Sequence, residues 1–317
     1  MKAKRVLVVR KRSALERHLE GKSDKRAAEL LAKGDVVVSK WTLAHEAHQA
    51  ALHTVLSALD KLNAEYTVCA LSELHDAVRP REGALDLVLT VGGDGTLLGT
   101  SHALGDDVPV LGINSAPGLS VGFFCATDAR GAADCLADAL RGTLSELPLT
   151  RMRIVRNDDE ELTRRVLNEI LFCHHSPAAT SRYLLSAPRL LRGKREVIME
   201  DQRSSGVWIG PPAGSTAAMR SAGGEVLPLT SSSIQYVVRE PYVPLGERLA
   251  LRRGVVQPGE RLELRSKMRR AKLFVDGQEL VLSVELGDML SFTSSPEPLR
   301  VLGLAHTETK RRKRAPE

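Results

Sequence analysis

The sequence predicts an α/β N-terminal domain built on a parallel sheet, followed by a C-terminal domain that is all β. In the first half, short apolar runs alternate with segments of helical spacing, which is typical of a parallel α/β sheet. After about residue 145, short strand-like runs follow one another with Pro and Gly between them, which is typical of an all-β domain. A length of 317 residues suffices for two domains of roughly 100–200 residues each. We expect an α/β domain at 1–145, a β-rich domain at 146–305 and a basic tail at 306–317.

The elements of the first domain follow from the spacing of apolar residues. Residues 5–10 are a short β-branched run that predicts a buried strand, and residues 42–62 place apolar side chains on one helix face. The predicted strands cover 5–10, 66–70, 85–91 and 108–113, and the predicted helices lie within 11–34, 42–62 and 131–141. In such sheets, ligands bind at the carboxyl ends of the strands.

The second domain is predicted from short β-branched and apolar runs that turn residues separate. These runs cover 152–155, 166–172, 182–186, 207–209, 234–238, 261–264, 272–275 and 280–284. Pro and Gly cluster between several of them, for example at 210–212 and 258–259. We therefore expect a series of short strands with little helix.

Composition and charge limit the classes of partner. The chain is 43% hydrophobic and 26% charged, which is ordinary for a globular protein. Aromatic residues make up 3%, which disfavours a single-strand nucleic-acid binder because such proteins stack bases on aromatic rings. The net charge is +6, and five positive charges stand together at 310–314, where we expect a solvated chain end rather than a nucleic-acid-binding segment. The remaining positive charge suits a polyanionic substrate such as ATP or a dinucleotide.

The cysteines and histidines give no sign of a metal site. Cys69, Cys125, Cys135 and Cys173 form no CxxC pair, and we expect them to be reduced. The pair His45 and His48 has the wrong spacing for an HExxH motif, and we expect a solvated helix face there. His174 and His175 follow a predicted strand, and we expect them on a loop surface. No signal-peptide pattern or long apolar run is present, so we expect a cytoplasmic protein without a membrane segment.

The segment 89–99, Leu-Thr-Val-Gly-Gly-Asp-Gly-Thr-Leu-Leu-Gly, is the most informative part of the chain. Gly92, Gly93 and Gly95 leave no side chain to block an approaching phosphate, and their N–H groups can turn toward an anion. Asp94 would repel phosphate, but it can orient a hydroxyl or accept its proton while a phosphoryl group is delivered. The alternative interpretation is a tight strand-to-helix turn with an Asp cap.

Three further segments combine polar or small residues with strand ends. Asn168 and Glu169 stand in an apolar run, where a polar pair is costly to bury unless it is hydrogen-bonded, so they form a turn or face a ligand. Residues 214–224, Gly-Ser-Thr-Ala-Ala-Met-Arg-Ser-Ala-Gly-Gly, predict a short helix with Ser215 as its N-cap and a backbone that a ligand can approach. Residues 275–278, Val-Asp-Gly-Gln, predict a hairpin turn.

These four segments, in this order, resemble the GGDGT, NE, GSTA…SAGG and DGQ motifs of the NAD kinase family. The co-linear resemblance covers roughly residues 85–300. The GGDGT loop is shared more loosely with diacylglycerol and sphingosine kinases and with phosphofructokinases, but the lipid kinases lack the GST…SAGG segment. The resemblance implies a fold of the NAD kinase and diacylglycerol kinase-like type, with a site in the cleft between the two domains. It also implies a homo-oligomer, a dimer or tetramer. The composition and the lack of long apolar runs lead us to expect no membrane or nucleic-acid partner.

The resemblance also implies an activity and a set of site residues. The activity is ATP-dependent phosphorylation of the adenosine-ribose 2′-hydroxyl of NAD(H) to give NADP(H), with Mg²⁺ supplied with ATP and no metal ligands from the protein. Asp94 is implied as the general base, and Gly92, Gly93 and Thr96 as the phosphate-side loop. The implied substrate-binding residues are Gly95, Asn168, Glu169, Arg203, Thr216, Ala217, Ser221 and Gln278.

The sequence departs from the common family pattern in ways that affect the acceptor. Ser205 stands where common members have Asp, Ala218 stands where they have Tyr, and the segment 112–124 contains extra residues. These features, with residues 238–241, look more like the plant NADH kinase and mitochondrial NAD kinase branch. A preference for NADH is therefore one alternative. A lipid or sugar kinase on the same loop and a non-catalytic dinucleotide sensor are two others.

Overall fold

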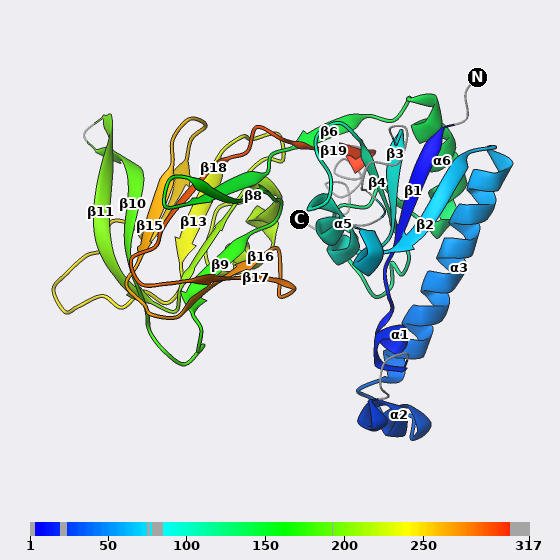
Figure 1. Ribbon diagram of the computed structural model, residues 1–317, viewed down its shortest axis with the longest axis horizontal. Helices are drawn as coiled ribbons and strands as arrows, with labels where there is room; N and C mark the ends of the chain where they lie inside the picture. Colours follow the sequence, from blue (N-terminus) through cyan, green and yellow to red (C-terminus); the bar gives the residue numbers. More distant parts are fainter. Residues whose placement is uncertain (1–3, 20–23, 75–76, 78–84, 192, 305–317) are drawn as a thin grey trace, which may run out of the picture. The chain divides into compact units, whose positions relative to one another are not determined.

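The computed structural model describes residues 4–19, 24–74, 77, 85–191 and 193–304 (Figure 1). The predicted basic tail, 306–317, lies outside these residues. The chain forms two compact units, one of residues 1–147 and 300–317 and the other of residues 148–299. Each unit has a hydrophobic core of its own.

The first unit is built on a seven-stranded sheet in which the strand order is β2-β1-β3-β4-β19-β6, with β5 beside β4. The strands are β1 (Arg5–Arg10), β2 (Glu65–Ala70), β3 (Leu87–Gly92), β4 (Val110–Asn114), β5 (Thr127–Asp128), β6 (Glu146–Leu149) and β19 (Leu299–Leu302). β1 pairs in parallel with β2 and β3, and β4 pairs in parallel with β3, β5 and β19. The carboxyl ends of the central strands therefore meet at one edge of the sheet.

Helices cover this sheet because its central strands β1, β3 and β4 are apolar and buried on both faces. The helices are α1 (Ala14–Leu19), α2 (Lys25–Ala32), α3 (Ser39–Lys61), α5 (Asp94–Ser101) and α6 (Ala132–Arg141), with 3₁₀ turns η1 (Leu71–Glu73) and η2 (Ala129–Gly131). Val55 and Leu59 of α3 and Leu136 of α6 share a core with Val8 of β1 and Leu89 of β3. This packing places α3 and α6 against the sheet (Figure 1).

The second unit consists of two six-stranded antiparallel sheets, with strand orders β11-β10-β15-β18-β7-β8 and β14-β13-β12-β9-β16-β17. The strands of the first are β7 (Met152–Arg156), β8 (Glu160–Val166), β10 (Ser181–Leu191), β11 (Lys194–Ser204), β15 (Leu262–Ser266) and β18 (Met289–Ser294). Those of the second are β9 (Ile170–His174), β12 (Val207–Gly210), β13 (Ile234–Val238), β14 (Arg253–Val256), β16 (Ala271–Val275) and β17 (Leu280–Val284). The short helical turns η3 (Pro212–Thr216) and α7 (Ala218–Ser221) follow β12.

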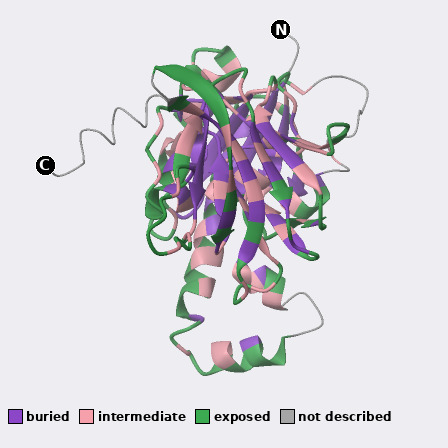
Figure 2. Cartoon of the chain, turned by 90° about the vertical axis from the view of Figure 1, so that its left-hand side faces the viewer, coloured by how far each residue is buried: buried purple, intermediate pink, exposed green. Residues whose placement is uncertain are grey.

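One core joins these two sheets. Tyr183, Leu264 and Phe292 of the first sheet share it with Phe172 and Leu273 of the second. Buried and more exposed residues alternate along β15 and β16. Figure 2 shows such an alternation of colours along strands of this unit. This alternation is expected when one face of a strand packs on the opposite sheet and the other faces outward.

The predicted fold class is confirmed: a parallel α/β unit and a unit of antiparallel sheets. Some details differ from the expectation, among them the course of the run 166–172 and the place of residues 299–302. The run 166–172 is not one strand, because β8 ends at Val166 and β9 begins at Ile170, with the polar pair between them. Residues 299–302 form β19 in the sheet of the first unit, although they fall within the predicted second domain, because the short apolar run fits beside β4.

The expected solvated face at His45 and His48 is wrong for His48. His48 is fully buried, and neither of its ring nitrogens has a hydrogen-bond partner in the described part of the chain. The residues after β1 account for this burial, since the Ser13 hydroxyl lies 2.9 Å from His45 Nδ1 and Glu16 accepts a hydrogen bond from Gln49 of α3. Burial lowers the pKa of His48 to about 4, so the ring is neutral at physiological pH.

Candidate active site

The glycine loop connects β3 to α5. β3 ends at Gly92 and α5 begins at Asp94, and Gly92 is in register with Asn114 at the end of β4. The Ser115 N–H donates a hydrogen bond to the Gly92 carbonyl over 2.9 Å. The loop therefore lies at the carboxyl edge of the parallel sheet, where the sequence placed it and where such sheets bind ligands.

The Asp94 carboxylate is anchored through one oxygen. Its Oδ1 accepts a hydrogen bond from the Phe124 N–H over 2.8 Å, which connects the first turn of α5 to the segment after β4. Its Oδ2 has no hydrogen-bond partner among the described residues, and the side chain is half-buried. This geometry orients the carboxylate while one oxygen stays available to a hydroxyl group.

The three glycines of the loop have different surroundings. A Cβ on Gly92 would lie 2.1 Å from Thr96 Oγ1, and a Cβ on Gly93 would lie 2.5 Å from Ser120 Oγ. A Cβ on Gly95 would meet no atom within 4 Å, and Gly95 is exposed. Gly92 is thus required by packing against the Thr96 side chain, a Cβ on Gly93 would displace the Ser120 hydroxyl, and Gly95 presents open backbone to a ligand.

The segment after β4, in which the sequence contains extra residues, is held by Asn114. The Asn114 amide donates to the Ser120 carbonyl over 3.1 Å and accepts from the Ala116 N–H over 3.1 Å. Gly122 has a left-handed φ of +61°, and a Cβ there would lie 2.3 Å from Asn114 Nδ2. Asn114 therefore folds the insertion back so that Phe124 reaches Asp94.

Asn168 and Glu169 lie in the turn between β8 and β9, and the turn is organised by Asp276. The Asp276 carboxylate accepts hydrogen bonds from the N–H groups of Leu167, Asn168 and Glu169 over 2.8, 2.7 and 3.1 Å. The Asp276 N–H in turn donates to the Glu169 carbonyl over 2.9 Å. One carboxylate thus fixes the backbone of both Asn168 and Glu169, because hydrogen bonds to a charged acceptor are stronger than neutral ones.

Glu169 is a buried carboxyl group with unused hydrogen-bonding capacity. It is 9% exposed, and its Oε2 has no partner among the described residues. Burial, with the neighbouring Asp276 carboxylate, raises the pKa of Glu169 to about 7, against an opposing hydrogen bond from the Asn168 side chain. Near neutral pH, Glu169 can therefore either donate or accept a hydrogen bond.

The segment after β12 packs directly on this turn. A Cβ on Gly214 would lie 1.7 Å from the Asn168 carbonyl oxygen, and a Cβ on Gly210 would lie 2.5 Å from the same atom. The structure thus brings the 214–224 segment and the Asn168 turn into backbone contact. Thr216 and Ser221 are exposed beyond it, and Ala217 is half-buried.

Ser215 is not the N-cap that the sequence predicted. It is fully buried, its hydroxyl donates to the Pro212 carbonyl over 2.6 Å, and it accepts from the Leu227 N–H over 3.0 Å. The helix α7 begins only at Ala218 and has no side-chain cap. Ser215 instead connects the 3₁₀ turn to the following loop.

The remaining two predicted site residues, Gln278 and Arg203, lie at different places in the second unit. Gln278 is exposed in the four-residue loop between β16 and β17, immediately after Asp276 and Gly277. Arg203 is exposed on β11, and the structure does not bring it to the Asn168 turn. Gly206, three residues after Arg203, lies against Cys173, near the end of β9 that is opposite to Asn168.

Two residues that orient the site were not predicted in that role. The Phe124 N–H anchors Asp94, and a backbone donor leaves no signal in the sequence. Asp276 was predicted only as part of a hairpin turn, although an Asp in a Val-Asp-Gly-Gln turn is a side chain that caps free N–H groups. The signal was present, but the sequence does not show which N–H groups the carboxylate meets.

In the described ranges, no group of three or more His, Cys, Asp and Glu side chains is placed to hold a metal ion. Within the same ranges, no helix has the length and apolar character needed to cross a bilayer.

The chain is similar to enzymes of one kind. Residues 6–143 match the family model of the ATP-NAD kinase N-terminal domain. A probable NADH kinase of Oryza sativa subsp. japonica is 32% identical over 270 residues, which cover 80% of this chain and 81% of that protein. The NADH kinase of Arabidopsis thaliana is 33% identical over 274 residues, which cover 82% of this chain and 84% of that protein.

A solved structure shows the same fold. The crystal structure of an NAD kinase from Archaeoglobus fulgidus in complex with ATP matches with a TM-score of 0.61 at 20% identity. The match covers 98% of this chain and 100% of that chain, so it includes both units.

Proposed function

We propose a function from the premise that this chain belongs to the NAD kinase family. The chain is an enzyme that phosphorylates NAD(H) with ATP to give NADP(H). The observation that carries this function is the glycine loop at the carboxyl edge of β3, where the Asp94 carboxylate is held through one oxygen only. Phosphoryl transfer depends on positioning and charge stabilisation, which such a loop and a fixed carboxylate supply.

Asp94 is proposed as the general base for the adenosine-ribose 2′-hydroxyl. The 2′-oxygen forms a bond to the γ-phosphorus, the bond from that phosphorus to the β–γ bridging oxygen breaks, and ADP leaves with that electron pair. The hydroxyl proton passes to the Asp94 carboxylate. The hydrogen bond from Phe124 to Oδ1 supports this role, because it orients the carboxylate and leaves Oδ2 for the hydroxyl.

The substrate contacts are proposed from exposure and backbone geometry. Gly95 offers open backbone, and the Asn168 turn presents a backbone held by the Asp276 carboxylate together with the buried Glu169 carboxyl group. The proposed dinucleotide contacts are Gly95, Asn168, Glu169, Arg203, Thr216, Ala217, Ser221 and Gln278, and Gly92, Gly93 and Thr96 form the proposed phosphate-side loop. Thr216, Ser221 and Gln278 are exposed, so a sugar or phosphate can reach their polar groups.

Mg²⁺ is proposed to enter as its complex with ATP, and thus as part of the substrate. Metal-bound phosphate needs few protein ligands, since Mg²⁺ keeps several waters and binds phosphate oxygens. We also propose a homo-oligomer, a dimer or tetramer, which light scattering after size exclusion measures directly. A cytoplasmic location stays a prediction.

The test is an assay of the purified protein with Mg²⁺-ATP and either NAD⁺ or NADH. NADP(H) is measured with a coupled dehydrogenase that accepts only the phosphorylated dinucleotide. Product from either acceptor supports the function. No product from both acceptors, together with tight dinucleotide binding, would favour a dinucleotide sensor, and phosphorylation of diacylglycerol or a sugar without dinucleotide turnover would favour the lipid or sugar kinase alternative.

A preference for NADH is the more specific candidate. It is supported by the two plant relatives, which are named as NADH kinases, and by the absence of a carboxylate and an aromatic ring at Ser205 and Ala218. Ala218 is half-buried at the start of α7, next to the proposed contact Ala217. Comparison of kcat/KM for NADH and NAD⁺ decides the matter, and a strong preference for NAD⁺ would contradict it.

A further inference from the structure

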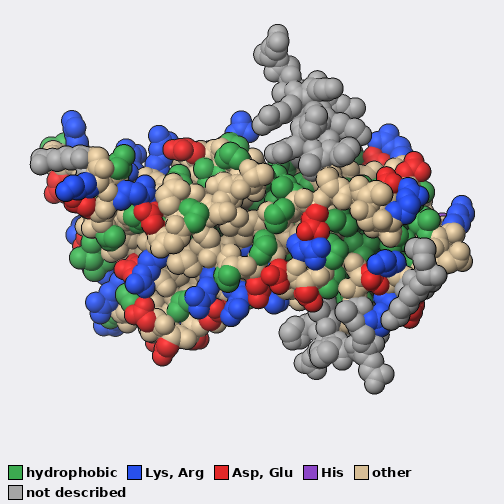
Figure 3. Space-filling view, turned by 90° about the horizontal axis from the view of Figure 1, so that it is seen from above, with side chains coloured by type: hydrophobic (Ala, Val, Ile, Leu, Met, Phe, Trp, Pro, Cys, Tyr) green, Lys and Arg blue, Asp and Glu red, His purple; other side chains and the backbone are tan. Residues whose placement is uncertain are grey.

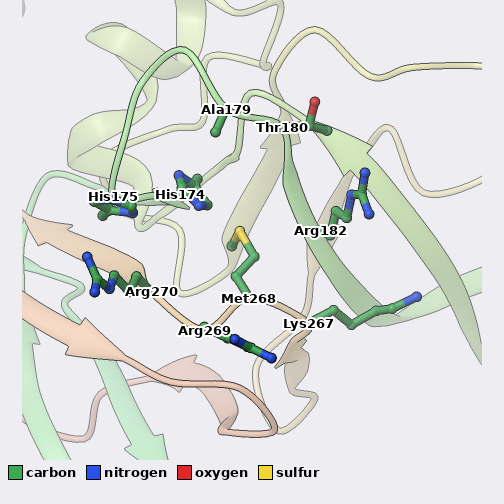
Figure 4. A pocket seen from close by; sticks show the side chains of 9 residues that line it. All are labelled: His174, His175, Ala179, Thr180, Arg182, Lys267, Met268, Arg269 and Arg270. Carbon is green, nitrogen blue, oxygen red and sulfur yellow. The ribbon is translucent and has the colours of Figure 1, made fainter.

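A pocket of about 500 Å³ lies in the second unit (Figure 4). Its walls come from three places: the end of β9 with His174 and His175, the start of β10 with Arg182, and residues 267–270 between β15 and β16. Met268 stands between the histidines and Arg182 (Figure 4). The volume is that of a small-molecule site and exceeds the size of a single phosphate.

The charged side chains of this pocket are all basic. Arg182, Lys267, Arg269 and Arg270 line it, and no Asp or Glu does. Lys267 is compensated, since its Nζ lies 2.6 Å from the Asp201 carboxylate. The three arginines have no ion pair in the part of the chain that the structure describes, whereas Arg156 and Arg300 elsewhere are paired with carboxylates.

The pocket gathers around one hollow three arginines without an ion pair among the described residues. On the face shown in Figure 3, Lys and Arg side chains are interspersed with Asp and Glu. Guanidinium groups bind phosphate oxygens through two parallel hydrogen bonds, so a concave site with three of them favours phosphate over a halide or a single carboxylate.

The backbone fixes the walls of the pocket relative to one another. The Lys267 N–H donates to the Arg182 carbonyl over 3.0 Å, and the His175 N–H donates to the Arg270 carbonyl over 3.1 Å. The His174 N–H donates to the Ser181 hydroxyl over 2.9 Å at the start of β10. The arginines are thus mounted on hydrogen-bonded segments, which reduces the entropy lost when a ligand binds.

The register of the sheet separates this pocket from the Asn168 turn. β9 and β16 are antiparallel, with His174 opposite Ala271 and Ile170 opposite Val275. Glu169 and Asp276 therefore lie at one end of the pair, and His174 and Arg270 lie at the other. At roughly 3.3 Å per residue, the five steps from residue 169 to residue 174 span about 16 Å.

We propose that this pocket is a second anion site of the chain and binds a small oligophosphate, that is, a chain of two or three linked phosphoryl groups. Three arginines match the charge of such a chain, whereas orthophosphate would leave charge and volume unfilled. The site is not part of the proposed phosphoryl transfer, since none of its residues is a proposed contact of NAD(H) or ATP.

Isothermal titration of the full-length protein with sodium tripolyphosphate tests this site. We expect the Arg269→Gln/Arg270→Gln double variant to weaken binding at least tenfold and Arg182→Gln, on a different strand, to weaken it at least threefold. The matched control is Arg248→Gln/Arg252→Gln, which removes two exposed arginines of the same unit that do not line the pocket and leaves the affinity within twofold. Thermal unfolding of each variant confirms that it is folded.

The outcomes separate this site from the active site. Unchanged tripolyphosphate affinity in the Arg269/Arg270 and Arg182 variants, or equal affinity for orthophosphate, would overturn the proposal. A rise in KM for ATP or NAD(H) in these variants would also overturn it, because the pocket would then belong to the catalytic site. Addition of ADP distinguishes the two sources of the phosphoryl chain. Displacement of tripolyphosphate by ADP indicates that the pocket binds the phosphates of a nucleotide, and no displacement indicates that it binds a free oligophosphate. Either result supports the pocket.

Discussion

Asp94 has one oxygen held by the Phe124 N–H and the other without a partner among the described residues. Asparagine at this position keeps an acceptor for that N–H and removes the base. We therefore expect Asp94→Asn to lower kcat by about 10²- to 10⁴-fold, as loss of a general base does, with little change in dinucleotide affinity. The coupled NADP(H) assay measures the rate, and Asp106→Asn, an exposed carboxylate of the same unit, is the control. Unchanged turnover in Asp94→Asn would refute its assignment as base.

Glu169 makes the stability of the protein depend on pH. Its pKa is about 7 in the folded chain against 4.5 for an ordinary Glu, so the folded state binds an extra proton between these values. The proton that Glu169 binds in the folded state stabilises the protein fully below pH 4.5, and this stabilisation is lost as the pH rises through 7. We expect the wild type to lose on the order of 3 kcal/mol relative to Glu169→Gln between pH 4 and pH 9. Urea unfolding at several pH values measures this difference, and a constant difference would contradict it.

Among the elements, the Asn168 turn depends on Asp276 more than on its own side chains. Asp276 has a φ of 49°, which Asn tolerates, so Asp276→Asn keeps the backbone and removes the charged acceptor of three N–H groups. We expect a loss of about 1–3 kcal/mol in the free energy of unfolding and a rise in KM for NAD(H). Asp288→Asn is the control, because Asp288 caps a different turn through the Glu285 N–H and is expected to cost stability without changing KM. An unchanged KM in Asp276→Asn would contradict the positioning role.

Gly214 and Gly95 are needed for different reasons, Gly214 for packing and Gly95 for access of the ligand. Gly214→Ala places a Cβ 1.7 Å from the Asn168 carbonyl oxygen, so we expect it to destabilise the protein by roughly 3 kcal/mol or to prevent folding. Gly95→Ala meets open space and is expected to keep the stability or raise it by up to about 1 kcal/mol. It is nevertheless expected to weaken dinucleotide binding, because the methyl group stands where the substrate is proposed to lie. Thermal unfolding and KM measured on both variants test this contrast, which normal activity of Gly95→Ala would contradict.

The elements that the sequence predicted best are those with strong local patterns. The strand Leu87–Gly92 and the glycine turn after it were predicted, as a strand over 85–91, from a mostly apolar run that leads into two glycines. The strand β11 was missed because its eleven residues are mostly charged and exposed, and it forms only by pairing with β10. His48 was misplaced because its burial depends on Ser13 and Glu16, which lie more than thirty residues away in the sequence.

At the scale of the whole molecule, the sequence predicted the two architectures but not their connectivity. The fold class follows from the spacing of apolar residues and from the Pro and Gly residues between strands, which are local properties of the chain. The identity of neighbouring strands is not local: β19 pairs with β4 far along the chain, with Val301 opposite Val110. The site shows the same limit, since the candidate residues were found from motifs, whereas the contacts of Asp94 with Phe124 and of the Asn168 turn with Asp276 come from tertiary structure.

The return of β19 has a consequence for how the protein is made. The strand lies between β4 and β6, and Arg300 is paired with Glu146 over 2.7 and 2.8 Å, so the second unit is inserted between two adjacent strands of the first (Figure 1). We expect a fragment of residues 1–147 to show no cooperative melting by circular dichroism, and the same fragment with residues 299–304 attached through a Gly/Ser linker to regain it. A cooperative transition in the shorter fragment would contradict this. During synthesis on the ribosome, the sheet of the first unit therefore cannot be completed until β19 has been made. The inserted second unit can complete its fold earlier.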